Sequence, residues 1–156
     1  MARLDLRQYL TIQGQERYRA FIIHAGAMEG KTALAQRMRD VLGAHLLNLQ
    51  AYFLTHSELA EAIDRFRPDD LRELLLHIDV PENVIVVDNM DFLLNTWSDR
   101  HLKAIVDMVD LGLKSPDTTD KTFVLMMQTA PVLLRRRLTN SRRQPRIFHR
   151  DAFYAL

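Results

Sequence analysis

One stretch of the chain, residues 19–38 with the sequence RAFIIHAGAMEGKTALAQRM, restricts the fold more than any other. Residues 20–25 are rich in β-branched and aromatic side chains, which predicts a buried strand. Two glycines follow, and residues 31–42 then repeat apolar side chains at helical spacing before Gly43, where a C-terminal cap is expected. The sequence therefore predicts a strand, a tight turn and a helix in direct succession.

The turn is compatible with the phosphate-binding pattern G-x-x-x-x-G-K-[ST] at every position but the first, where Ala25 replaces glycine. In this pattern backbone N–H groups at a helix N-terminus cradle phosphate oxygens. Lys31 would reach the β- and γ-phosphates, and the Thr32 hydroxyl would hold Mg²⁺. The alternative is an ordinary strand-to-helix turn with a surface lysine. The predicted binding residues are Ala25, Gly26, Ala27, Met28, Glu29, Gly30, Lys31 and Thr32.

Strands and helices alternate along the rest of the chain. We expect an α/β fold, a three-layer sandwich with a central parallel sheet of about five strands. Residues 1–156 form one domain in this interpretation, with an N-terminal helix or arm at 1–18 and a basic C-terminal segment at 131–156. Further strands are expected at 45–50, 83–88, 122–129 and 146–156, and a loop at 115–121. A broken helix or a helix pair on either side of Pro68 is expected at 57–77, and helices at 97–113, with Ser98 as N-cap, and at 131–138.

The composition is that of an ordinary globular domain, with 47% hydrophobic and 26% charged residues. The absence of cysteine excludes disulfides and thiolate metal sites. No run of residues reaches the roughly 18 apolar positions of a membrane span. We therefore expect no membrane contact and a cytoplasmic location.

A second polar feature follows the apolar run VIVVD at 84–88. A carboxylate at the carboxyl end of a buried strand is suited to reach the Mg²⁺ shell of a bound nucleotide. Asp88 occupies this place, and we predict that it holds the metal together with Thr32. The alternative is that Asp88 only caps the next turn.

The loop at 25–32, the acidic strand at 84–88 and the polar-ended strand at 122–129 resemble, in this order, P-loop ATPases of the AAA-like branch. The stretches VIVVDNMDFLL and QTAPVLLRRRL also resemble the small stand-alone P-loop proteins of type 3 BREX phage-defence systems, the BrxF family. The resemblance implies ATP and Mg²⁺ as ligands and an antiviral role within a larger DNA-targeting assembly. The chain departs from the AAA-like pattern at Ala25 and Asn89 and in lacking an obvious C-terminal helical lid.

Many of these ATPases carry a glutamate directly after the strand-end aspartate, where it activates the attacking water. Here that position is Asn89, which can orient water but cannot accept its proton. Hydrolysis should therefore be slow unless Asp91 acts as the base; the alternative for Asp91 is a solvated acid. Gln128, at the end of the strand 122–129, fits the place of a γ-phosphate sensor or of a simple hydrogen-bonding residue.

The basic segment 131–156 contains seven arginines and one acid, Asp151. It is consistent with an arginine finger to a neighbouring subunit, for which we select Arg142 and Arg143, with a kinase lid, or with a solvated face. It is also consistent with DNA or RNA phosphate contacts. The predicted DNA-contacting residues are Arg135, Arg136, Arg137, Arg142, Arg143 and Arg146.

Three functions follow from these patterns. The first is an ATP-binding switch, with ATP and ADP as ligands, that hydrolyses ATP weakly and associates with itself or with a larger protein complex. The second is a small-molecule P-loop kinase, although Met28 stands where kinase loops usually have another glycine. The third is a nucleic-acid-binding module with a vestigial nucleotide site, which the retained Lys31, Thr32 and Asp88 disfavour.

Overall fold

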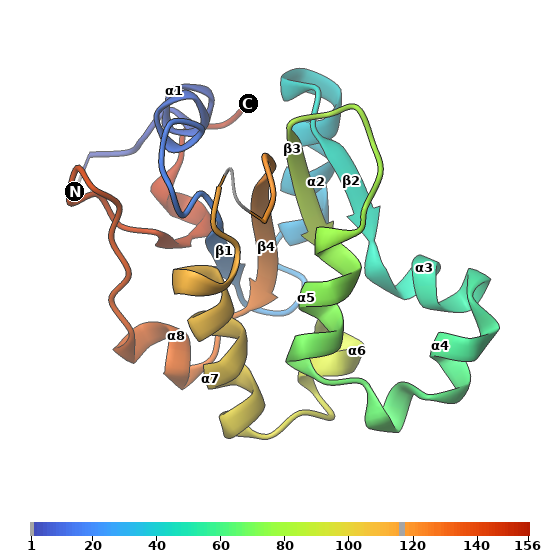
Figure 1. The fold of residues 1–156 in the computed structure, drawn as a ribbon. Helices are drawn as coiled ribbons and strands as arrows, with labels where there is room; N and C mark the ends of the chain where they lie inside the picture. The colour runs from blue at the N-terminus through green and yellow to red at the C-terminus, as the bar shows by residue number, and fades with distance from the viewer. Residues whose placement is uncertain (1, 116–117) are drawn as a thin grey trace.

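The computed structural model describes residues 2–115 and 118–156 and contains a five-stranded sheet in which every strand pair is parallel (Figure 1). The strand order is β2-β3-β4-β1-β5. The predicted α/β fold with a parallel sheet of about five strands is confirmed. The strands are β1 (Phe21–Ala25), β2 (His45–Asn48), β3 (Val84–Asp88), β4 (Thr122–Gln128) and β5 (Ile147–His149).

The order of the strands separates β1 from β3 by one strand, β4. The glycine-rich turn after β1 and the acidic end of β3 therefore lie on either side of the end of β4. Since all strands run in the same direction, their carboxyl ends share one edge of the sheet. This edge carries Ala25, Asp88 and Gln128, with Ala25 paired in register with Gln128.

Helices cover both faces of the sheet (Figure 1). Neighbouring residues of β1 show this division, because Ile22 packs in one buried cluster while Phe21 and Ile23 pack in the other. The helical elements are α1 (Leu6–Gln13), α2 (Lys31–Leu42), α3 (Leu49–Thr55), α4 (Ser57–Glu61), η1 (Ile63–Arg65), α5 (Pro68–Leu76), α6 (Asp91–Leu94), α7 (Asp99–Asp107), η2 (Met108–Gly112), α8 (Pro131–Arg135) and η3 (Arg150–Ala152).

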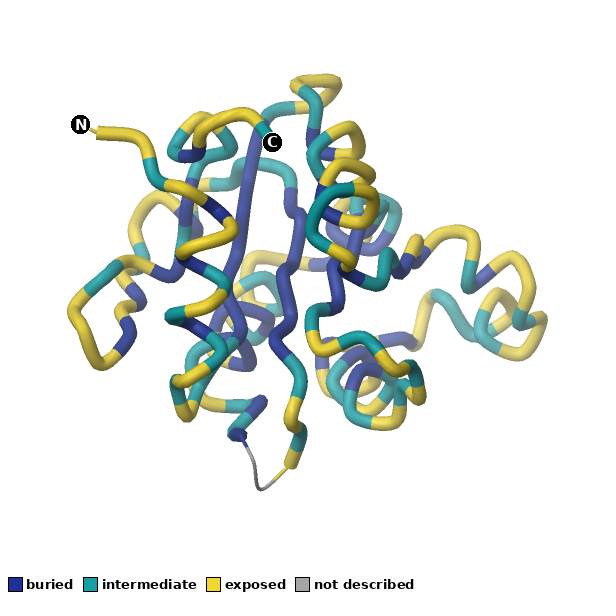
Figure 2. Tube along the Cα trace, turned by 90° about the horizontal axis from the view of Figure 1, so that it is seen from above, coloured by how far each residue is buried: buried dark blue, intermediate teal, exposed yellow. Residues whose placement is uncertain are grey.

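Two apolar cores hold these layers together. The larger lies between the sheet and α3, α5, α6, α7 and α8, and the smaller lies between the sheet, α1, α2 and the segment after β5. Figure 2 shows the strands buried at the centre and exposed positions on the outer helices and loops. Strands covered on both faces are apolar without alternation, which explains the continuous runs in β1, β3 and β4.

Local sequence signals set several helix ends. Gly43, at φ +71°, ends α2 in the left-handed conformation that glycine adopts without strain. Pro68 is the first residue of α5, as expected from a helix broken at this proline. Ser98, in the extended conformation, occupies the predicted N-cap of α7, and its backbone N–H donates to the ring nitrogen Nδ1 of His101 at 3.2 Å.

Three predicted elements are shorter in the structure. The strand expected at 45–50 ends at Asn48, because the side chain of Asn48 caps α3. The helix expected at 131–138 ends at Arg135, where the backbone turns extended and Arg136 forms an ion pair with Asp107, 2.7 Å away. The strand expected at 146–156 covers only β5. The loop expected at 115–121 includes residues 116 and 117, which lie outside the described residues.

Within residues 2–115 and 118–156, no helix has the length and apolar character needed to cross a membrane.

Candidate functional site

The loop between β1 and α2 has a shape that depends on two left-handed residues. Met28 has φ +60° and is fully exposed, and Gly30 has φ +92°. At Gly30 a side chain would be strained by the backbone and would also lie within 3.0–3.3 Å of the Arg150 guanidinium. Glycine is therefore required at this position, as the phosphate-loop pattern demands.

Lys31 is the first residue of α2 and is almost fully buried at 9% exposure. Its ammonium nitrogen lies 3.5 Å from the carbonyl oxygen of Gly26 and 3.7 Å from a carboxylate oxygen of Asp91. The alternative of an ordinary surface lysine does not fit this burial. The positive end of the α2 dipole and the Lys31 charge thus meet at the loop, where they favour an anion.

Glu29 folds its side chain over the start of the same loop. One of its carboxylate oxygens lies 1.8 Å from the place that a Cβ on Gly26 would occupy. A side chain at Gly26 would therefore displace the flexible end of Glu29 from this place. The backbone N–H of Glu29 also donates to the Gly26 carbonyl, which closes the turn.

The acidic end of β3 supplies two carboxylates that differ in environment. Asp88 is buried at 2% exposure, while Asp91 begins α6 and is partly exposed. One oxygen of Asp91 faces Lys31, and the other is buried with no hydrogen-bond partner among the described residues. Asn89, between them, has φ +57°, a conformation that asparagine tolerates better than most residues. The turn made by Asn89 precedes the helix that carries Asp91.

The other predicted binding residues lie on the same edge of the sheet. Thr32 is exposed in the first turn of α2, and Ala25 is buried as the last residue of β1. Gln128 is partly buried at the end of β4. In the described part of the chain no hydrogen bond or ion pair joins Asp88 to Lys31 or Thr32.

A histidine cluster at this edge was not found by sequence reasoning. His24 Nδ1 lies 2.9 Å from the Thr129 hydroxyl, and its ring meets that of His149 edge-on at 5.4 Å. Burial, together with the nearby His149, lowers the pKa of His24. The only sequence signal for this cluster is a histidine inside an otherwise apolar strand.

Two of the arginines predicted to contact DNA are occupied within the fold. Arg146 is buried at 2% exposure; its guanidinium donates to the carbonyl oxygens of Ala20 and Val109 and pairs with Asp110 at 3.4 Å. Arg136 pairs with Asp107 and, at 3.9 Å, with Asp110. The prediction of a DNA contact through Arg146 is therefore wrong, because this side chain satisfies buried carbonyl groups instead of facing solvent.

Two of the remaining arginines lie apart from the loop of their own chain. Arg135, Arg137, Arg142 and Arg143 are exposed. Arg142 and Arg143 precede β5 and therefore lie toward the amino edge of the sheet, opposite the loop. Any finger role for Arg142 or Arg143 would have to be toward a neighbouring chain.

Arg150 is the arginine that does contact the loop. It follows β5 at the carboxyl edge, and its guanidinium donates to the carbonyl oxygen of Glu29 and packs against Gly30. Sequence reasoning counted Arg150 in the basic segment without assigning it a role. Its place directly after the last strand, at the edge that carries the loop, was the available signal.

A cavity of about 330 Å³ adjoins the loop beside Arg150. Its wall combines the start of α2 with the segment after β5, so that apolar, aromatic and basic side chains meet there. The lining residues are Arg3, Gly30, Ala33, Leu34, Arg37, Arg150, Asp151, Phe153, Tyr154, Ala155 and Leu156.

Comparison with known proteins adds no assignment: no protein-family model matches the chain, and no curated protein matches it significantly. The described residues contain no group of three or more His, Asp or Glu side chains arranged to hold a metal ion by themselves.

Proposed function

We propose that this chain is an ATP-binding P-loop protein, a weak or partner-activated ATPase that acts as a switch. The observation that carries the proposal is the position of Lys31, buried at the start of α2 between the loop carbonyl of Gly26 and the carboxylate of Asp91. A buried ammonium group at a helix N-terminus beside a glycine-dependent turn is suited to bind a polyphosphate.

Mg²⁺ fits this site as a partner of the nucleotide. Magnesium bound with a nucleotide needs only one or two protein ligands, because phosphate oxygens and water supply the others. Thr32 and Asp88 are the residues that would hold it, from α2 and β3. When bound, the ion would neutralise charge on the β- and γ-phosphates.

Weak hydrolysis follows from the groups around the γ-phosphate position. Asn89 can orient water, and Asp91 is the nearby group able to accept a proton. Asp91 is also the counter-ion of Lys31, so the two roles compete. Gln128, in register with Ala25, is the proposed sensor of the γ-phosphate.

The cavity beside Gly30 supports a nucleotide rather than inorganic phosphate as the ligand. Its volume of about 330 Å³ is at the lower end of the range for small-molecule sites. Tyr154, which is 56% exposed at its wall, offers an aromatic face to a base. Arg150 would sit between the base and the phosphates.

The proposed setting is a multi-protein, DNA-associated defence assembly, as the resemblance to the small BREX P-loop proteins suggests. DNA contact would use the exposed residues Arg135 and Arg137. A kinase is less well supported, because the basic turn at residues 139–145 precedes β5 and therefore lies toward the amino edge of the sheet, away from the loop.

The test is the affinity for ATP and for ADP, with and without Mg²⁺, of the wild type and of Lys31→Ala. We expect binding by the wild type that Mg²⁺ strengthens and a loss of about tenfold or more in the variant, since a charged contact to phosphate contributes about 1.5–3 kcal/mol. Lys103→Ala, at an exposed position of α7, is the matched control. If neither nucleotide binds the folded wild type, the proposal is wrong.

A further inference from the structure

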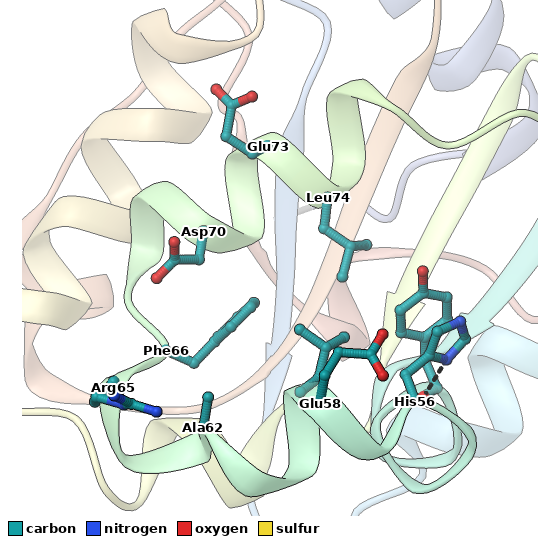
Figure 3. Close-up of a pocket in the computed structure, with 10 residues that line it drawn as sticks. His56, Glu58, Ala62, Arg65, Phe66, Asp70, Glu73 and Leu74 are labelled. Carbon is teal, nitrogen blue, oxygen red and sulfur yellow. Dashed lines mark hydrogen bonds between the residues drawn. The ribbon is translucent and has the colours of Figure 1, made fainter.

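The segment after β2 forms a helical arm, defined here as residues 49–76. It extends outward from the side of the sheet that β2 forms (Figure 1). A cavity of about 480 Å³ opens in it between α3, α4 and α5 (Figure 3). The lining residues are Tyr52, His56, Glu58, Leu59, Ala62, Arg65, Phe66, Asp70, Glu73 and Leu74. This arm cavity is separate from the site around Lys31.

The arm cavity combines flat aromatic surface with acidic groups. The rings of Tyr52 and His56 stack at 3.9 Å with an angle of 15°. The carboxylate of Glu58 points toward His56 in Figure 3, and no hydrogen bond or ion pair of Glu58 is found within residues 2–115 and 118–156. A carboxylate beside a stacked aromatic pair suits a guanidinium group, which can stack and donate hydrogen bonds at the same time.

The other charges at the arm cavity do not change this preference. Asp70 is engaged by the backbone N–H of Arg67 at 2.8 Å, and Glu73 lies 3.4 Å from Arg72. Arg65 is a cation in the lining, but the surrounding segment is acidic overall. The arm, residues 49–76, contains six acids against three arginines.

The other side of the sheet, which β5 forms, carries a basic turn at residues 139–145 that we call the arginine turn. A bridge between Thr139 and Pro145 closes it, and the Asn140 side chain accepts from the backbone N–H groups of Arg142 and Gln144 at 2.9 and 3.0 Å. These contacts hold the turn in one shape. A turn that is already ordered loses little conformational entropy when it binds.

The two arginines at the tip of this turn are presented to solvent. Arg142 and Arg143 are both exposed. Arg142 reaches Gln15 at 3.2 Å, whereas the side chain of Arg143 has no hydrogen bond or ion pair with any described residue. Of these two arginines, Arg143 is therefore the more available to a partner.

Within one chain the arginine turn and the arm cavity cannot meet. The arm follows β2, the outer strand on one side of the sheet, and the turn precedes β5, the outer strand on the other side. Five strands separate the edges by about 19 Å or more, from a spacing of about 4.8 Å between neighbours. Figure 1 shows α4 and the segment between α8 and β5 on opposite sides of the molecule.

We propose that the arginine turn of one copy docks into the arm cavity of a second copy, with Arg143 against Glu58 and the Tyr52–His56 pair. The two surfaces differ, so the contact is head-to-tail and can repeat from copy to copy. Opposite charges on the two surfaces supply the complementarity. The contact does not involve the loop around Lys31 and stands independently of nucleotide binding.

The test is sedimentation velocity at low salt over a range of protein concentrations up to about 100 μM, where an interaction with a micromolar Kd is populated. We expect the wild type to form dimers and larger species. Glu58→Arg should weaken association at least tenfold, because it replaces attraction by repulsion at the docking site. The double variant Arg142→Glu/Arg143→Glu should weaken it to the same extent. Glu61→Arg, which is exposed on α4 but does not line the cavity, should associate as the wild type does.

The decisive measurement mixes the Glu58→Arg variant with the double arginine variant. The first keeps an intact arginine turn and the second keeps an intact arm cavity, so the mixture should form a one-to-one complex that cannot grow further. A folded wild type that stays monomeric overturns the proposal. So does a mixture that remains monomeric, or a set of variants that associate like the wild type. Salt-sensitive DNA binding by a monomer through Arg142 and Arg143 would assign the turn to nucleic acid instead.

Discussion

The ammonium nitrogen of Lys31 lies 3.7 Å from a carboxylate oxygen of Asp91, and these two residues begin the helices α2 and α6 at the carboxyl edge of the sheet. The distance is compatible with an ion pair but long for a direct hydrogen bond. A phosphate group entering the loop would have to compete with Asp91 for Lys31. Asp91 is therefore placed to hold the lysine and, in the proposed function, to act on a phosphate that replaces it as the partner of Lys31.

Replacing Asp91 by asparagine separates these two roles. We expect Asp91→Asn to bind ATP up to about fivefold more tightly in the absence of Mg²⁺, because a partly exposed competing charge worth about 1 kcal/mol or less is removed. Turnover should fall at the same time if Asp91 is the base. Equilibrium nucleotide binding and phosphate release measure the two effects. Weaker binding by the folded variant would show that Asp91 orders Lys31 instead of competing for it.

Introducing a carboxylate at Asn89 tests whether the site lacks a base. We expect Asn89→Glu to raise the rate of phosphate release at least tenfold, since a positioned general base contributes about 10²–10⁴-fold. The left-handed conformation at φ +57° should reduce stability by about 1 kcal/mol. Asn89→Gln carries the same conformational cost without a base and is the control. Rapid turnover by the wild type would contradict a weakened site.

Removing Arg150 should loosen the loop that it contacts. We expect Arg150→Ala to weaken ATP binding about tenfold, because a charged hydrogen bond to the Glu29 carbonyl is lost beside the phosphate position. Arg142→Ala, at the opposite edge, should bind like the wild type. Titration with a fluorescent ATP analogue measures the difference. Unchanged affinity of Arg150→Ala would exclude Arg150 from the site.

The buried arginine has a different role, which stability measurements can isolate. Arg146→Met should lower the free energy of unfolding by about 3–5 kcal/mol, because it leaves the buried carbonyl groups of Ala20 and Val109 without their charged donor and removes one of the two cations beside Asp110. Arg137→Met, at an exposed position, should change it by about 0.5 kcal/mol or less. Denaturant titration distinguishes the two. A mild effect at Arg146 would mean that water replaces the guanidinium.

Stability should depend on pH through His24. Its pKa in the folded protein is lowered from the ordinary value of 6.5, first by burial and then by His149, so the folded state favours the neutral ring. The unfolded chain takes up a proton near pH 6.5, and the free energy of unfolding should therefore decrease as the pH falls below this value. Denaturant titrations between pH 7 and pH 5 should give a shallower dependence for His24→Gln than for the wild type. The exposed His77→Gln is the control, and an unchanged slope in His24→Gln would contradict this origin.

The parts of the fold that depend on local chemistry were predictable from the sequence. Helix α2 has the expected bounds, because periodic apolar residues and Gly43 define it without outside contacts. The strands β1, β3 and β4 were predictable from continuous apolar runs. Asn48 shows the limit of this approach, since its β2 pairing and its capping of α3 compete, and only the folded geometry decides where the strand ends.

The positions of the arginines could not be predicted, because they depend on partners far away in the sequence. Arg146 meets Val109 and Asp110, more than thirty residues earlier, and Arg150 meets Glu29, 121 residues earlier. A run of basic residues gives no information on which member turns inward. The approach of Asp91 to Lys31 follows the same rule: the sequence indicates both residues as candidates but not that they form a pair.

The pairing of β1 on both sides has a consequence for how the loop forms during folding. Its register partners are β4 and β5, which begin about 100 and 125 residues later in the chain. During synthesis, the loop after β1 can therefore have no complete support until nearly all of the sequence shown has left the ribosome. Contacts of such long sequence separation form slowly, because bringing together two distant parts of the chain costs conformational entropy before any contact compensates for it. We expect the loop to become competent for ligand only in the last step of folding, so that a stalled or incomplete chain would not retain nucleotide.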